Sequence, residues 1–424
     1  MGFGVASRFS TTSCSKFPAM SSSEAVASND DLLTEILVHL PIKSLMKFKC
    51  ISKHWQSLIS SPGFSRRRYP DYHLVSGLIL RPTYDCVVKK EYDFVPLKYT
   101  STTAPFRSLT FVNIPSGLII LQSCNGLLLC ASSISDWNIP CDYCIYNPTS
   151  HEFVTVPPLG DENSRFIRRI GLAYDPAKSS HFKIVCIRSD SLEVIQNAGI
   201  SYQIEVYSSQ TGSWRLSGVP FVLPYNSQYG AGVFWNGAIH WISHCHACLC
   251  FKVDEEQLQE MPMPPLTRDP ADRIAGFMRS FVYFGESREH LHFVVNVDNH
   301  SKKFDVYEMQ RDYSGYFVKY RVDLDVIIAA FPEMDVPSDE DDFLFFYAFD
   351  CYKYSILGII REANDEESYM VLHIPGKVIR YKLNDKTFTK ICDFHPGHED
   401  VEGSQLEFTR LHAYHYMETL ARFG

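Results

Sequence analysis

Residues 118–131 have the sequence LIILQSCNGLLLCA, in which Asn125-Gly126 separates two short apolar runs. An Asn-Gly pair between apolar runs strongly indicates a β-hairpin, because a type I′ turn needs two residues with positive φ. The same arrangement recurs at residues 231–243, where Asn236-Gly237 takes the central place. Two hairpins built on the same turn predict a repeated β unit.

Apolar pairs with other turns extend this pattern along the chain. First pairs are expected at Ile170–Tyr174 with Phe182–Ile187, Phe281–Phe284 with Leu291–Val297, and Leu344–Phe349 with Ser355–Ile360. Second pairs follow at Tyr143–Tyr146 with Glu152–Val156, Tyr202–Tyr207 with Ser213–Leu216, Leu249–Val253 with Leu258–Met261, Phe304–Met309 with Phe317–Val322, and Val378–Leu383 with Phe388–Cys392. The unit is therefore four short strands repeated five times, which is typical of β-propeller blades.

The two ends of this region supply further strands. Leu74–Leu80 and Phe94–Leu97 are expected to form part of a sixth blade, and Leu406–Tyr416 to complete it and close the ring. The fold class is thus mainly β, most simply a six-bladed propeller over residues 69–424. A stacked β-sandwich is the alternative.

A short helical module precedes the propeller. Residues 1–27 form a Ser-rich tail expected to be disordered. In residues 28–68, Ser28 is expected to cap a first helix that Pro41 ends, a second helix starts near Ser44, and Ser52 caps a third. Ser61-Pro62-Gly63 is expected to stop that third helix. A bundle of this size buries too little apolar surface to be stable alone, so we expect it to pack against another surface.

Composition and charge exclude several classes of protein. Hydrophobic residues make up 45% of the 424 residues and aromatic residues 14%, which excludes a mainly disordered chain. The net charge of −9 argues against a nucleic-acid partner, and no apolar run is long enough to cross a membrane. Residues 1–70 carry nine basic and four acidic residues, so the two modules differ in charge. The thirteen cysteines indicate a reducing compartment, the cytoplasm or nucleus.

The run from Asp31 to Trp55, with the order LPxKSLxxFKCxSKxW in its second half, resembles a plant F-box. The resemblance implies docking on a Skp-type adaptor and, through it, on a cullin. Ala27-Ser28-Asn29 departs from the Leu-Pro that many F-boxes carry before the first acidic residue. The positions expected to bind the adaptor are Leu32, Leu33, Ile36, Leu37, Leu40, Pro41, Leu45, Phe48, Cys50, Ile51, Trp55, Leu58 and Ile59.

The β region is similar to the plant F-box-associated domain, itself similar to kelch-type propellers. The motifs that carry this likeness are Ser123-Cys124-Asn125-Gly126-Leu127-Leu128, Tyr146-Asn147-Pro148-Thr149, Gly171-Leu172-Ala173-Tyr174-Asp175-Pro176, Val206-Tyr207-Ser208 before Trp214, and Asn236-Gly237-Ala238-Ile239-His240-Trp241. The likeness weakens beyond residue 262. Such proteins are substrate receptors of Skp–cullin–F-box (SCF) ubiquitin ligases, so the resemblance implies a non-catalytic receptor with no cofactor.

Strand order predicts which face of the propeller binds a target. Turns between strands one and two and between strands three and four lie on one face and are short. The other connections are long, and loops above ~12 residues in a compact domain are usually functional or disordered. The candidate target-binding residues on that second face are Arg165, Phe166, Arg168, Arg169, Tyr225, Tyr229, Arg268, Arg273 and Phe277.

One cluster resembles a metal site. His240, His244, Cys245, His246, Cys248 and Cys250 lie within eleven residues, but alternate residues of an extended strand face opposite ways. We therefore expect these side chains to fill blade interiors and to bind no metal. The alternative function is a propeller enzyme or metal-binding protein whose amino-terminal helices are only structural.

Overall fold

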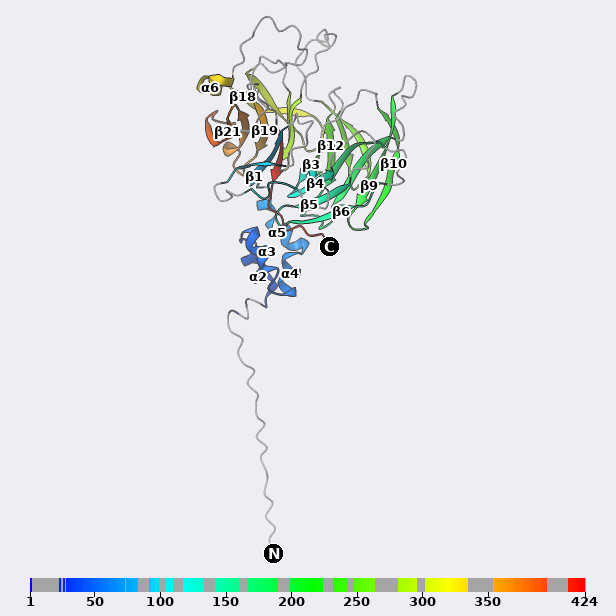
Figure 1. Cartoon of the computed structure of the whole chain (residues 1–424). Helices are drawn as coiled ribbons and strands as arrows, with labels where there is room; N and C mark the ends of the chain where they lie inside the picture. The colour runs from blue at the N-terminus through cyan, green and yellow to red at the C-terminus, as the bar shows by residue number, and fades with distance from the viewer. Residues whose placement is uncertain are drawn as a thin grey trace.

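The computed structural model describes residues 1, 23, 26, 28–72, 74–82, 91–98, 104–109, 117–132, 142–159, 166–189, 199–223, 232–242, 248–263, 281–295, 302–334, 354–394 and 411–423. A small helical module lies at one end of a β-propeller, as Figure 1 shows. The Ser-rich tail and the segment Leu344–Phe349 lie outside the described residues almost entirely.

Residues 28–72 of the helical module, all of them described, contain four helices, one more than expected. They are α2 (Asp30–Leu37), α3 (Ile42–Phe48), α4 (Lys53–Ile59) and α5 (Pro62–Tyr72). The N-cap of α2 is Asn29 and not Ser28, because the Asn29 side chain accepts from the backbone N–H groups of Asp31 and Leu32. The prediction for Ser52 is confirmed, since its Oγ accepts from Trp55 N at 3.1 Å.

The third helix ends at Ile59, just before Ser61-Pro62-Gly63 as expected, and the additional helix α5 starts at Pro62. Proline is favoured in the first turn of a helix, where its missing N–H costs nothing, and Ser61 Oγ accepts from Phe64 N at 3.1 Å. Arg67 forms an ion pair with Glu35 at 3.1 Å, and Arg68 donates to the carbonyls of Val38 and Leu40 at 2.6 Å each. Two of the basic residues in this module therefore fasten α5 to α2.

The described strands of the β region form five four-stranded antiparallel sheets and one three-stranded sheet. Blade 1 is β3 (Leu118–Cys124), β4 (Leu127–Ser132), β5 (Tyr143–Asn147) and β6 (Glu152–Val156). Blade 2 is β7 (Phe166–Ala173), β8 (Lys183–Ser189), β9 (Ile200–Ser208) and β10 (Ser213–Leu223). Blade 3 is β11 (Val233–Trp235), β12 (Ala238–Ile242), β13 (Cys248–Lys252) and β14 (Gln257–Met261).

Blades 4 and 5 follow the same plan. Blade 4 is β15 (Phe281–Ser287), β16 (His290–Val295), β17 (Lys303–Met309) and β18 (Tyr316–Asp323), followed by α6 (Asp325–Ala330) and the 3₁₀ turn η2 (Pro332–Met334). Blade 5 is β19 (Ser355–Ile360), β20 (Tyr369–Ile374), β21 (Lys377–Lys382) and β22 (Phe388–Asp393), with the 3₁₀ turn η3 (Asp365–Glu367) between β19 and β20.

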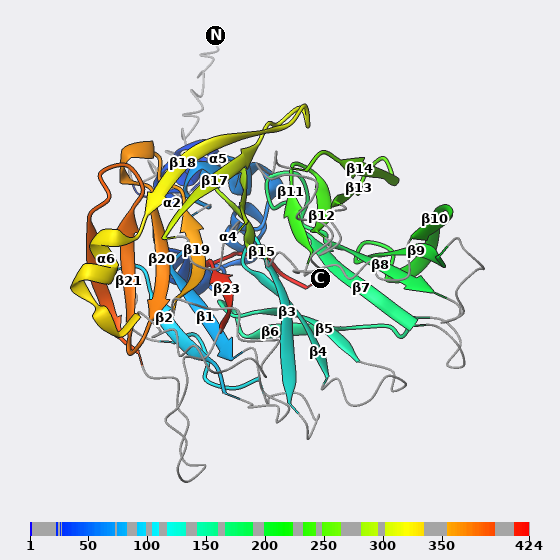
Figure 2. The same cartoon turned by 90° about the horizontal axis from the view of Figure 1, so that it is seen from above.

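Blade 6 joins the two ends of the β region, as predicted. Its order is β2 (Asp93–Pro96), β1 (Gly77–Pro82) and β23 (Leu411–Tyr416), with β23 innermost. The innermost strands β3, β7, β11, β15, β19 and β23 each contact the next, and β23 contacts β3 again. Figure 2 looks down on this arrangement. The propeller interpretation with six blades is confirmed, and the sandwich alternative is wrong.

The strand assignment in blade 5 differs from the expectation. Ser355–Ile360 is the first strand of the blade and not the second, and its partner is β20, a strand that the apolar pairing had not identified. Every residue of β20 is buried, so its sequence, YMVLHI, shows no alternation of polar and apolar positions. Without that alternation, a short apolar run is easily assigned to the wrong place in a repeat.

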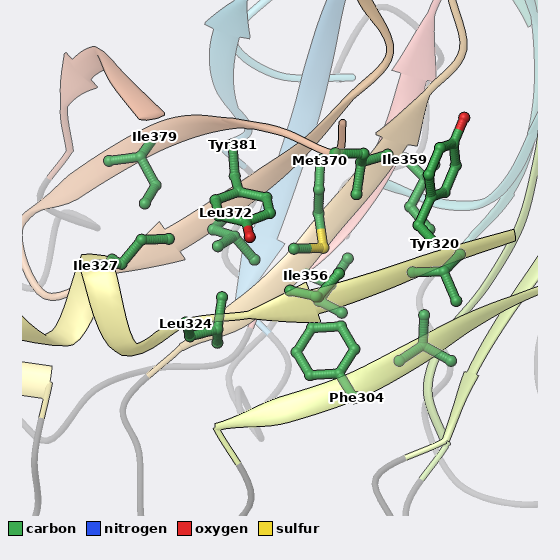
Figure 3. Close-up of a cluster of buried hydrophobic side chains, with 14 of the residues drawn as sticks. Phe304, Tyr320, Leu324, Ile327, Ile356, Ile359, Met370, Leu372, Ile379 and Tyr381 are labelled. Carbon is green, nitrogen blue, oxygen red and sulfur yellow. The ribbon is translucent and has the colours of Figure 1, made fainter. Parts of the chain in front are cut away.

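The core lies between neighbouring blades. Between blades 4 and 5, Phe304 and Val306 of β17 pack with Ile356 and Ile359 of β19 and with Met370 of β20. Figure 3 shows this cluster, in which Leu324 and Ile327 at the start of α6 close one side. Because each blade buries both of its faces against its neighbours, losing one blade would expose two apolar surfaces.

Candidate adaptor-docking and target-binding surfaces

The first helix of the helical module divides its apolar side chains between two faces. Leu33 and Leu37 of α2 are buried in the module core, whereas Leu32 is 50% exposed and Ile36 is 53% exposed. Ile51, between α3 and α4, is 59% exposed. Three large exposed apolar side chains on so small a module are typical of a docking surface. We refer to Leu32, Ile36 and Ile51 as the exposed apolar set.

The other residues expected to contact an adaptor lie mostly inside the module. Leu45 and Ile59 are fully buried, and Phe48 and Trp55 meet edge to face with their centroids 5.5 Å apart. Leu40 and Leu58 are half-buried, while Pro41 and Cys50 are exposed. The buried members stabilise the module, so a direct contact with a partner would come from the exposed members. Their assignment to adaptor binding remains a prediction.

The helical module sits on the face of the propeller that carries the short turns. A cavity of about 430 Å³ separates α4 and α5 from the turns of blade 2, and its lining includes Ile59, Ser65, Pro176, Phe182 and Ser209. We call this side the short-turn face and the opposite side the long-connection face. Helix α6, in the connection from blade 4 to blade 5, lies at the opposite end of the molecule from α2–α4 (Figure 1).

Three residues expected in a target-binding loop belong to a strand. Phe166, Arg168 and Arg169 lie in β7, because β8 continues to pair with β7 as far as Phe166 opposite Ser189. The strand expected at Ser213–Leu216 is also longer than predicted, since β10 extends to Leu223. The remaining candidates lie outside the described residues: Arg165, Tyr225, Tyr229, Arg268, Arg273 and Phe277.

The extended part of β10 carries an apolar surface that the sequence reasoning missed. Leu216 is 62% exposed, Val219 is 81% exposed and Val222 is 46% exposed, on the outermost strand of blade 2. The run VPFVL at residues 219–223 was the available signal, but Pro220 indicated a loop. In the structure Pro220 lies at a register shift between Ser217 and Phe221, where no ladder hydrogen bond is needed.

The centre of the ring contains a cavity of about 430 Å³ lined by the innermost strands. Glu286 and His415 contribute to this lining. Burial raises the pKa of Glu286 to about 7 and lowers the pKa of His415 to about 4. Both shifts favour the uncharged form of the side chain, as expected for groups removed from bulk water.

The cluster that resembled a metal site fills a blade interior where it is described. His240, Cys248 and Cys250 are buried, and burial raises the pKa values of the Cys248 and Cys250 thiols to about 12 and about 11. Such thiols stay protonated and are poor ligands or nucleophiles. Within the described residues no group of three or more His, Cys, Asp or Glu side chains could hold a metal ion. His244, Cys245 and His246 lie outside them.

No helix among the described residues combines the length and the apolar character that crossing a bilayer would need.

Four short helices with an exposed apolar set, joined to a six-bladed propeller, define a protein with an F-box and a propeller. A family model described as "F-box domain" matches residues 29–67, and one described as "F-box associated beta propeller domain" matches residues 102–312. The chain is 35% identical over 384 residues to F-box protein At5g07610 from Arabidopsis thaliana, covering 88% of this chain and 87% of that protein. The chain therefore belongs to the plant F-box proteins with an F-box-associated propeller.

Other relatives match over a shorter stretch. The putative F-box/kelch-repeat protein At1g12870 from Arabidopsis thaliana is 24% identical over 259 residues, 56% of this chain and 59% of its own length. Putative F-box protein At1g53370 from the same plant is 25% identical over 242 residues, 53% of this chain and 59% of its own length. The match with each of these two relatives spans about three fifths of that relative's own length.

Proposed function

We propose that this protein is a substrate-recognition subunit of an SCF-type ubiquitin ligase. The F-box would dock on a Skp-type adaptor and, through it, on a cullin, and the propeller would bind a target protein for ubiquitination and degradation. Holding the target beside a charged ubiquitin-conjugating enzyme raises its effective concentration there. The observation that carries this proposal is the exposed apolar set at the end of the molecule opposite the long-connection face.

The receptor would itself be non-catalytic. Ubiquitin transfer needs a nucleophilic or metal-bound centre, which other subunits of the ligase would supply. Burial raises the pKa values of the Cys124, Cys186 and Cys248 thiols, so these cysteines are not activated nucleophiles. We place the protein in the cytoplasm or nucleus, where thirteen cysteines would stay reduced.

The adaptor contact is tested with the combined change Leu32→Ala and Ile36→Ala. Each side chain has about half of its surface left to bury, so the pair would contribute roughly 1.5–3 kcal/mol. We expect affinity for a purified Skp-type adaptor, measured by calorimetry, to fall about 10- to 100-fold. The module should stay folded, because neither side chain lies in its core.

Leu216→Ala is the control, since Leu216 is also exposed, at 62%, but lies on blade 2. Its adaptor affinity should equal that of the unchanged chain. Failure of the unchanged chain to bind any Skp-type adaptor would refute the proposal. Affinity capture in the presence of a proteasome inhibitor would then identify the target.

A further inference from the structure

The last described residues of the chain leave blade 6 and run between the two modules. We call residues 417–423 the C-terminal tail. On the propeller side, Thr419 N donates to Thr149 Oγ1 at 3.0 Å, and Asn147 Nδ2 donates to the Ala421 carbonyl at 2.8 Å. The Phe423 ring meets the Phe182 ring edge to face, with centroids 6.1 Å apart. These contacts attach the tail to the turns of blades 1 and 2.

The same tail enters the core of the F-box. Leu420 is buried and belongs to the apolar cluster formed by Leu33, Leu37, Val38, Ile42, Leu45, Ile59 and Phe64. Lys49, between α3 and α4, donates from Nζ to the Leu420 carbonyl at 3.0 Å. The Lys49 side chain is itself buried, and burial lowers its pKa to about 8. A buried lysine needs such an acceptor, because an unpaired one is costly.

Direct packing between the modules is incomplete beside the tail. The cavity between α4, α5 and blade 2 is lined on one side by Leu420 and Phe423 of the tail. A module of about 40 residues buries too little apolar surface to be stable alone. The tail supplies part of the missing core and a second connection, besides the chain that links α5 to β1.

We propose that the C-terminal tail clamps the F-box onto the short-turn face and thereby fixes the direction in which the F-box presents an adaptor relative to the long-connection face. Lys49 and Leu420 are the positioning residues of this clamp. The second half of the inference rests on the proposed function, whereas the clamp itself does not.

Gly126 provides a sharp test of the clamp. A Cβ at this position would lie 2.6 Å from Thr419 Cβ and 2.9 Å from the Met417 carbonyl oxygen, so an alanine there must displace the tail. Gly237 occupies the same place in the second Asn-Gly turn, with φ +76° against +88° at Gly126. A Cβ at Gly237 would meet only Lys178 Nζ, at 3.7 Å. The two substitutions therefore share the backbone strain and differ in the tail contact.

The experiment compares amide hydrogen exchange in the full chain, Gly126→Ala and Gly237→Ala. We expect the amides of α3 and α4 to exchange at least about tenfold faster in Gly126→Ala, because local opening of the F-box becomes more frequent. In Gly237→Ala they should exchange within about twofold of the unchanged chain. Equal exchange in the two variants would overturn the clamp.

A second pair of variants tests the clamp if Gly126→Ala does not fold. Leu420→Ala should also accelerate exchange in α3 and α4 by about tenfold or more, since it removes the tail side chain from the F-box core. Leu216→Ala, which truncates an exposed leucine on the outermost strand of blade 2, should leave the rates unchanged. If the amides of α3 and α4 exchanged no faster in Leu420→Ala than in the unchanged chain, the clamp would also be overturned.

The presentation of the adaptor is measured separately by small-angle scattering of the chain bound to a Skp-type adaptor. The radius of gyration should increase in Gly126→Ala and stay constant in Gly237→Ala, and an unchanged radius in both would refute the presentation role. If no adaptor binds the unchanged chain, the proposed function fails. The exchange result still decides the clamp, because it needs no partner.

Discussion

His240, in the motif Asn236-Gly237-Ala238-Ile239-His240-Trp241, has a structural role. Its ring is buried, with Nδ1 3.2 Å from the Val233 carbonyl oxygen and Nε2 3.1 Å from Tyr313 Oη. Because a carbonyl can only accept, Nδ1 carries the hydrogen and Nε2 accepts from the tyrosine hydroxyl. Burial lowers the pKa of His240 to about 4. The histidine joins the first two strands of blade 3 to the Tyr313 turn of blade 4.

Burial of His240 predicts that this residue contributes a loss of stability in mild acid, which the raised pKa of Glu286 opposes. Unfolded histidine takes up a proton near pH 6.5, whereas folded His240 does so near pH 4, so the unfolded state binds more protons in that window. Stability present above pH 6.5 should therefore be lost as the pH falls toward 4, by up to ~3 kcal/mol from this residue. His373 and His415 add losses of the same sign, since burial lowers their pKa values to about 4 as well.

Urea unfolding at a series of pH values measures this loss. His240→Gln should reduce the slope of unfolding free energy against pH between 6.5 and 4, although the variant is less stable at neutral pH. His181→Gln, which changes an exposed histidine, should keep the slope of the unchanged chain. An unaltered slope in His240→Gln would show that the buried ring titrates normally.

At the scale of elements, β23 determines whether the ring closes. It pairs with β1 from Gly77 opposite Tyr416 to Pro82 opposite Leu411, and it contacts β19 and β3 on either side. Tyr416 is buried, and its ring lies edge to face on Phe94 of β2 with centroids 5.7 Å apart. One carboxy-terminal strand thus completes the core of three blades.

Substitutions in β23 should therefore cost far more than substitutions on an outermost strand. We expect Tyr416→Ala to lower the free energy of unfolding by about 3–5 kcal/mol. Phe317→Ala, on the outermost strand of blade 4, should lower it by about 1 kcal/mol or less, because that ring is already exposed. Deleting residues 411–424 should yield aggregated protein, since β1 would be left with an unpaired edge. Denaturant titration and size-exclusion chromatography measure these effects, and a soluble, fully stable deletion would show that the ring closes without β23.

At the scale of the whole molecule, the F-box and the long-connection face lie at opposite ends (Figure 1). Removing residues 1–72 should therefore leave a propeller that binds its target but no longer brings it to a ligase. Such a propeller should act as a competitor, so the target accumulates in cells that express it. Immunoblotting of the captured target measures this, with cells that express the unchanged chain as the reference. Unchanged target levels would contradict the proposal that the chain links its target to a ligase.

Much of this protein follows from local sequence. The Asn-Gly turns predict hairpins because both of their residues take positive φ, with Asn125 at 45° and Asn236 at 50°. The repeat of apolar pairs then predicts blades, and the strands left over at the two ends predict closure. The F-box motif predicts the helical module, because the Ser52 cap and the helical spacing of apolar residues each involve positions only three or four residues apart. Local steric and hydrogen-bonding rules are enough for all of these.

Other features depend on contacts between residues far apart in the sequence. The start of α5 at Pro62, the identity of β20 as a strand of blade 5 and the extension of β7 and β10 each depend on which segment packs or pairs beside them. The exposure of Leu32 and Ile36 against the burial of Leu33 and Leu37 likewise depends on where α4 and α5 pack. Sequence spacing places all four on one helix but does not say which side faces the core.

The C-terminal tail shows most clearly which features follow from local sequence and which depend on long-range contacts. The sequence by itself determined that Gly126 belongs to a tight turn, that Lys49 belongs to the F-box and that Leu420 lies near the end of the chain. Only the tertiary structure decided that Lys49 donates to the Leu420 carbonyl and that Thr419 passes over Gly126. The physical reason is that ring closure brings the last strand beside the first, and so places the end of the chain next to the module from which the chain began.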